Sequence, residues 1–229
     1  MEIVPTFTTT ALSTFEYLFS RFIPHCKTFQ IDIQDGLFVR NKTFEANELL
    51  TYLQNLSPEE LKTFLPATFD FHLMVQDYTA PLEAIHEIQK IVSVRYIFVH
   101  HNFSLVSHPN GEHIPICPTL NPEDSQVSDC RLLHKPVTSY PALQVMTIHP
   151  GPQGQTLIPQ QLNRIHDLRL AGYKGKIVVD GGINPASLQH ITSLPSTYHP
   201  DIVCIGSYLS RAPDYDIGAR IEALKALVH

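Results

Sequence analysis

Four short apolar segments of this chain each end at groups that can do chemistry. The segments IDIQDG, FDFHLM and VVDGG carry Asp32, His72 and Asp180, and the segment CIGS ends at Gly206 and Ser207. Two carboxylates and an imidazole are groups that hold a metal ion or transfer protons. A glycine followed by a serine lets backbone N–H groups approach a phosphate. The sequence therefore contains the parts of a metal or proton-transfer site and of an anion site.

Eight strand-like segments alternate with helix-like patterns and would position these groups. Apolar residues recur at helical spacing over 12–22, 162–170 and 221–227. The expected strands cover 2–5, 28–33, 67–74, 96–100, 114–120, 143–148, 176–180 and 202–205. This alternation is typical of a parallel sheet covered by helices, and eight units favour an α/β fold closed into a single (β/α)8 TIM barrel. The strands of such a barrel end in one mouth, where groups distant in sequence meet.

Length, charge and cysteine spacing narrow the class of protein. The 229 residues suit one barrel domain over 1–229, and no repeat, low-complexity tract or linker divides them. The 16 Lys and Arg residues are scattered, and the net charge of -6 argues against a nucleic-acid partner. The start MEIVPTF has no signal-peptide character, and no segment has the apolar length of a membrane span. The four cysteines, Cys26, Cys117, Cys130 and Cys204, show no CxxC spacing. We expect a reduced, cytoplasmic protein without a membrane partner.

The fourth connection between strands is expected to be short. Only 13 residues separate His100 from Ile114. Among them, Pro109, Asn110 and Gly111 oppose a long helix. The sequence predicts a crossover there that is shortened to a turn or two.

Seven motifs occur in the order in which they are found in the ribulose-phosphate 3-epimerase family, and the chain resembles this family over nearly its whole length. They are PTFTTTA, DIQDGLFVRNKTF, HLMV, PTLNP, MTIHPGPQGQ, VVDGGIN and IGS. The resemblance implies a ribulose-phosphate-binding barrel that interconverts D-ribulose 5-phosphate and D-xylulose 5-phosphate, an isomerase of the pentose phosphate pathway. It also implies a small-molecule sugar phosphate as the substrate and a homo-oligomeric assembly.

In that family, two histidines and two aspartates hold a divalent metal in the mouth of the barrel. By the resemblance, Asp32 and Asp180 are metal ligands and the acid/base pair, and His72 is one of the histidine ligands. A carboxylate on each face of the sugar removes a proton from one side and returns it on the other, through an enediolate that the metal stabilises. The resemblance leaves Zn, Mn, Fe and Mg open as the metal.

The position of the second histidine ligand holds Gln30. Its amide oxygen can bind a hard ion such as magnesium or manganese, but it is a poor match for zinc or ferrous iron. Gln34 and His149 also depart from the family pattern, so we expect an altered metal site. His100 and His101 follow a strand, and we interpret them as packing and surface histidines rather than ligands.

The substrate-binding residues that the resemblance implies lie in loops and at strand ends. The phosphate would be bound by Gly181, Gly182, Gly206 and Ser207. The sugar and the loop that covers it would involve Thr9, His72, Met74, Met146, Gly151 and Gly154. Pro152 should stiffen that loop. The two methionines either enclose the reacting carbons or simply fill the core.

Two other functions stay open at this point. A shared barrel and shared phosphate loops do not define the rest of the substrate, so the chain could be an epimerase or isomerase of another ketose phosphate. Alternatively, the replacement of a histidine by Gln30 could leave a sugar-phosphate-binding barrel without catalysis. Metal content separates the catalytic from the non-catalytic alternative.

Overall fold

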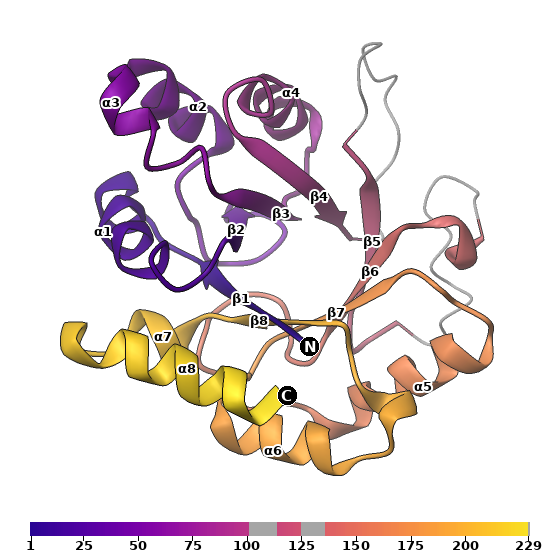
Figure 1. Ribbon diagram of the computed structural model, residues 1–229. Helices are drawn as coiled ribbons and strands as arrows, with labels where there is room; N and C mark the ends of the chain where they lie inside the picture. The colour runs from indigo at the N-terminus through magenta and orange to yellow at the C-terminus, as the bar shows by residue number, and fades with distance from the viewer. Residues whose placement is uncertain (101–113, 125–135, 229) are drawn as a thin grey trace.

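Eight parallel strands form a closed barrel in the computed structural model, which describes residues 1–100, 114–124 and 136–228 (Figure 1). The strands follow one another around the barrel in chain order, and β1 closes it by pairing with β8. Their bounds are β1 Glu2–Phe7, β2 Thr28–Gln34, β3 Thr68–Met74, β4 Ser93–Val99, β5 Ile116–Leu120, β6 Ala142–Met146, β7 Lys176–Asp180 and β8 Ile202–Ile205. The predicted (β/α)8 barrel is therefore confirmed.

Helices cover the outside of the barrel (Figure 1). In the described residues they are α1 Leu12–Phe22, α2 Ala46–Asn55, α3 Pro58–Leu61, α4 Thr79–Ile88, α5 Asn163–Leu170, α6 Pro185–Ser193, α7 Ser207–Ser210 and α8 Ile217–Val228. Short 3-10 segments are η3 Val137–Ser139, η4 Pro159–Leu162, η5 Ser196–Tyr198 and η6 Asp214–Asp216. Within this part of the chain, no helix has the length and apolar character needed to cross a membrane. The shortened crossover predicted between β4 and β5, together with His101 and Cys130, lies outside the described residues.

Phenylalanines of α1 pack against those of the first strands and of the segment before β3. The Phe7 ring lies 5.0 Å from that of Phe15 and 5.6 Å from that of Phe22, and the Phe19 ring stacks 4.5 Å from Phe64. The spacing of the three α1 rings places them on one helix face. All five side chains are buried, and burial of each ring stabilises the fold by roughly 1.5–3 kcal/mol. This cluster holds α1 against the barrel wall.

Alternation along each strand decides which side chains face the interior of the barrel. On β2, Phe29 and Ile31 belong to the core under the helices, so Gln30 and Asp32 point inward. Asp32 pairs in register with His72 of β3, which places both at the same height in the barrel. A separate apolar cluster fills the interior and consists of Val4, Phe98, Cys117, Ala142, Val178, Ile202 and Cys204. The described barrel therefore contains both buried polar groups and an apolar interior cluster.

Candidate functional site

Three predicted side chains converge at the carboxyl ends of β2, β3 and β7. Ligand atoms of Asp32, His72 and Asp180 all lie within 4.8 Å of one another. His72 Nδ1 is 3.4 Å from Asp32 Oδ1 and 3.4 Å from Asp180 Oδ2. Closure of the barrel thus brings together residues that are far apart in the sequence, as expected for strand ends in one mouth.

These three groups fit a divalent cation. His72 Nδ1 is buried without a hydrogen-bond partner in the described structure, although it points between the two carboxylates. Ligands at roughly 2.0–2.2 Å from one ion stand about 3 Å from one another, which is close to the spacing seen here. Carboxylate oxygens and an imidazole nitrogen are a common donor set for divalent metals. Asp32, His72 and Asp180 could therefore hold such an ion.

Gln30 is oriented as a hydrogen-bond donor to the same carboxylates. Its Nε2 donates to Asp32 Oδ1 over 3.1 Å and to Asp180 Oδ2 over 2.7 Å. Its Oε1 accepts a hydrogen bond from Cys204 Sγ over 3.1 Å, and Gln144 Nε2 gives Asp180 a further donor at 3.2 Å. The amide oxygen predicted to bind the metal therefore faces Cys204, because buried carboxylates favour donors beside them. Metal ligation by Gln30 requires its amide to turn over.

The first loop brings Thr8, the neighbour of the predicted Thr9, into contact with Asp32. Thr8 Oγ1 donates to Asp32 Oδ2 over 2.6 Å. Thr9 does not line the cavity described below, and its carbonyl oxygen accepts a hydrogen bond from the N–H of Phe44. The physical reason is strand alternation, because Thr6 lines the cavity and Thr8 continues on its side of the chain.

A histidine that the sequence interpretation set aside lies directly behind His72. His100 follows β4, is fully buried and has its Nε2 2.9 Å from His72 Nε2. The interpretation as a packing residue missed this contact. The position of His100 just beyond a barrel strand could have indicated this contact, because the other site residues also lie at strand ends. His149 is exposed and pairs with Glu123.

The pKa values of two site residues depart from their ordinary range. Burial opposes the charged form of His72, but Asp180 and Asp32 outweigh it and raise its pKa to about 9. Burial, together with the charge of Asp32, raises the pKa of the Asp180 carboxyl. Without a metal, the site therefore favours an imidazolium beside the two aspartates, and Asp180 accepts a proton more readily than an exposed aspartate does.

The metal-free protein should lose stability as the pH rises from about 6.5 to about 9. The pKa of His72 is about 9 in the folded chain against about 6.5 in an unfolded one, so its contribution is complete below about pH 6.5 and is lost as the pH rises through 9. The shift corresponds to a loss on the order of 3 kcal/mol in the free energy of unfolding. Urea unfolding in a chelator at several pH values measures this loss. If the unfolding free energy of a His72→Gln variant depended on pH as it does in the natural chain, the loss could not be attributed to His72.

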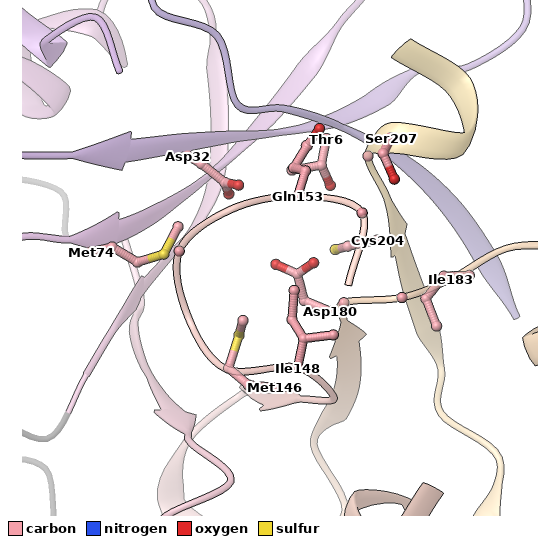
Figure 2. Close-up of a pocket in the computed structure, with 15 residues that line it drawn as sticks. Thr6, Asp32, Met74, Met146, Ile148, Gln153, Asp180, Ile183, Cys204 and Ser207 are labelled. Carbon is pink, nitrogen blue, oxygen red and sulfur yellow. The ribbon is translucent and has the colours of Figure 1, made fainter. Parts of the chain in front are cut away.

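Asp32 and Asp180 border a cavity at the mouth of the barrel (Figure 2). In Figure 2, Asp32 and Asp180 extend toward it from different strands, and Met74 and Met146 line its wall. The predicted loop residues also line it, namely Gly151, Gly154, Gly181, Gly182, Gly206 and Ser207. Gly182 has a φ of +69° and a side chain there would meet the Leu157 backbone at 2.4 Å, so only glycine fits this turn. The structure thus brings the predicted phosphate residues together beside the carboxylates.

Gln153 enters the same cavity and was not predicted. Its Nε2 donates to Thr8 Oγ1 over 2.7 Å. Its amide also lies against Gly206, where an added side-chain carbon would be 2.2 Å from Nε2. With Gln153 in this position, the cavity has a volume of only about 40 Å³. Sequence reasoning placed Gln153 only in a covering loop, and nothing in the sequence showed that this loop folds inward.

The fold and site define an α/β barrel in which two buried aspartates, a buried histidine and glycine-containing loops meet at the carboxyl ends of the strands. Residues 20–208 match the Ribulose-phosphate 3 epimerase family, and the chain belongs to this family. The chain is 29% identical over 167 residues to a ribulose-phosphate 3-epimerase of Treponema pallidum (strain Nichols), with 69% of each chain covered. The resemblance found in the motifs is therefore confirmed.

Solved structures of other proteins share the fold at low sequence identity. A chain of the tryptophan synthase complex of Pyrococcus furiosus has a TM-score of 0.61 at 12% identity, with 98% of both chains covered. Orotidine 5'-phosphate decarboxylase from Pyrococcus horikoshii OT3 has a TM-score of 0.55 at 13% identity, over 98% of this chain and 96% of that one. At these identities the similarity concerns the barrel alone.

Proposed function

We propose that the chain interconverts D-ribulose 5-phosphate and D-xylulose 5-phosphate by proton transfer at the third carbon. The observation that carries the proposal is the pair of buried carboxylates, Asp32 and Asp180, that border one cavity beside glycine-rich loops. Family membership supports a phosphorylated sugar as the substrate. The proposal extends to one domain over 1–229 and a cytoplasmic homo-oligomer of the pentose phosphate pathway, which the family resemblance supports.

Each aspartate has a role in the proposed proton transfer. One carboxylate removes the proton from the third carbon, and the other, in its protonated form, returns a proton to the opposite face. The raised pKa of Asp180 favours the form that donates. Hydrogen bonds from Thr8 and Gln30 hold the Asp32 carboxylate in place. In the reverse direction the two aspartates exchange roles.

A divalent cation held by Asp32, His72 and Asp180 would stabilise the negative charge that develops on the sugar oxygens. Oxygen-rich ligation favours Mg or Mn over Zn or Fe. The backbone N–H groups of Gly182 and Gly206 would bind the phosphate, since glycine lets an anion approach the main chain. Met74 and Met146 would lie against the carbon chain and exclude water from the reacting centre.

The loop between β6 and α5 must move to admit a sugar phosphate. The cavity of about 40 Å³ is much smaller than the roughly 300–1,000 Å³ of ordinary small-molecule pockets. Gln153 occupies the space beside Gly206, where the phosphate is expected. Binding therefore requires its side chain to leave this position, with loss of its hydrogen bond to Thr8.

Gln30 favours a second candidate function, a sugar-phosphate-binding barrel without catalysis. Its amide donates to both aspartates, so the two carboxylates have hydrogen-bond donors even without a metal. A site whose carboxylates are satisfied in this way can be stable without an ion. In that case the protein would bind the sugar phosphate and leave its protons in place.

Proton exchange in deuterated water tests the proposal. The purified chain is incubated with D-ribulose 5-phosphate, with and without added Mn²⁺ or Zn²⁺, and the proton on the third carbon is followed by NMR. We expect exchange together with the appearance of D-xylulose 5-phosphate, because the abstracted proton equilibrates with solvent. Bound sugar without exchange under any metal would instead support the binding barrel, or an enzyme for another ketose phosphate.

A further inference from the structure

Three buried side chains form a hydrogen-bonded row behind the proposed metal site. His72 Nε2 lies 2.9 Å from His100 Nε2, and His100 Nδ1 lies 2.9 Å from Asn121 Oδ1. The three residues come from the end of β3 and from the positions directly after β4 and β5. The exposed fractions of these three residues are 0%, 0% and 4%, so the row is shielded from bulk water.

The chemistry of the row determines which ring nitrogens carry hydrogen. An amide oxygen only accepts hydrogen bonds, so His100 Nδ1 must donate to Asn121 Oδ1. In a neutral imidazole the other nitrogen is then an acceptor, so His100 Nε2 accepts from His72 Nε2–H. A neutral His72 that donates from Nε2 has its lone pair on Nδ1. That atom is the one 3.4 Å from both Asp32 and Asp180.

We propose that His100 and Asn121 are positioning residues that hold His72 in the tautomer whose Nδ1 can bind a divalent cation. The inference rests on the proposed function, because it gives the row a purpose only if the site holds a metal. Metal-binding histidines commonly donate their second N–H to a fixed acceptor, which sets the tautomer and the ring orientation. Here the acceptor is a second histidine, and its own orientation depends on Asn121.

Neighbouring groups hold His100 itself in place. Its backbone N–H donates to the Tyr78 hydroxyl over 3.2 Å, and its ring lies 4.6 Å from the Phe38 ring. Tyr78 therefore holds the main chain of His100 and Phe38 packs against its ring, before any metal binds. Preorganisation of this kind increases affinity because little freedom is lost on binding.

Binding of Mn²⁺ alone, measured by calorimetry on the full chain, tests the proposal. We expect His100→Leu to weaken Mn²⁺ binding by about 10–100-fold, because His72 Nε2–H loses its acceptor. His100→Gln keeps an oxygen acceptor and should lose less. Asn121→Leu should weaken Mn²⁺ binding. Asn121→Asp keeps the acceptor oxygen and should bind Mn²⁺ nearly as tightly as the natural chain. His190→Gln, at an exposed histidine of α6, is the control and should bind like the natural chain.

Nitrogen-15 NMR of the histidine rings in the Zn²⁺-loaded protein provides a second measurement. We expect protons on His72 Nε2 and His100 Nδ1, and the loss of both signals in His100→Leu. Unchanged Mn²⁺ affinity in folded His100→Leu and Asn121→Leu, the opposite tautomer, or no Mn²⁺ binding by the natural chain would each overturn the proposal. Both measurements are made without sugar, so a failure of the epimerase activity alone leaves them unaffected.

Discussion

Asp180→Asn should reduce proton exchange at the third carbon of the sugar by about 10²–10⁴-fold, the usual contribution of a positioned acid or base. Asparagine has nearly the same size as aspartate but cannot take up or release the proton. Its amide oxygen can still accept the hydrogen bonds that Gln30 and Gln144 now donate to Asp180. The fold should therefore survive, and the loss should lie in the chemical step.

Two measurements separate this chemical loss from a structural one. Exchange is followed by NMR in deuterated water, and the binding of inorganic phosphate is measured on the same sample. Phosphate binding should be nearly unchanged, because the anion would contact backbone groups of the glycine loops rather than Asp180. Asp77→Asn is the matched control, since Asp77 is exposed and accepts from the Thr79 N–H, a role that asparagine also fills. Loss of exchange and phosphate binding together would indicate that Asp180 is structural.

Gln30→His should raise the affinity for Zn²⁺ and Mn²⁺ by at least 10-fold. Ordinary changes in the residues around a metal ligand alter affinity by roughly 10–100-fold, and a new imidazole adds a ligand directly. The substitution also removes the amide that donates to both aspartates, so their oxygens become available to the ion. Imidazole should shift the preference toward zinc. Calorimetric titration with each metal measures both effects.

Gln34→His is the matched control for this substitution. Gln34 is buried at the end of the same strand, two residues beyond Asp32, and donates to the carbonyl oxygen of Gly151. A histidine there increases the number of imidazoles in the barrel without restoring the missing ligand position. No gain from Gln30→His, or an equal gain from Gln34→His, would show that the surroundings of Gln30 no longer form the family's metal site.

The contacts made by the loops were the part of the site that the sequence predicted least well. Thr9 was predicted from its place in a motif, yet Thr8 contacts Asp32, because strand alternation continues one residue beyond β1. The sequence placed Gln153 only in a covering loop, yet its side chain donates a hydrogen bond to Thr8, 145 positions away in the chain. Contacts of this kind depend on how two loops close over each other, and neither loop has a repeating pattern that would reveal it.

The sequence by itself determined the barrel and the positions of Asp32, His72 and Asp180 at strand ends. Alternating apolar segments define strands and their inward faces locally, and the order of the motifs identifies the family. Only the tertiary structure decided that the Gln30 amide donates to both carboxylates and that His100 lies behind His72. The physical reason is that hydrogen-bond direction across the interior depends on the register of neighbouring strands and on which buried groups need a partner. Neither is a local property of the chain.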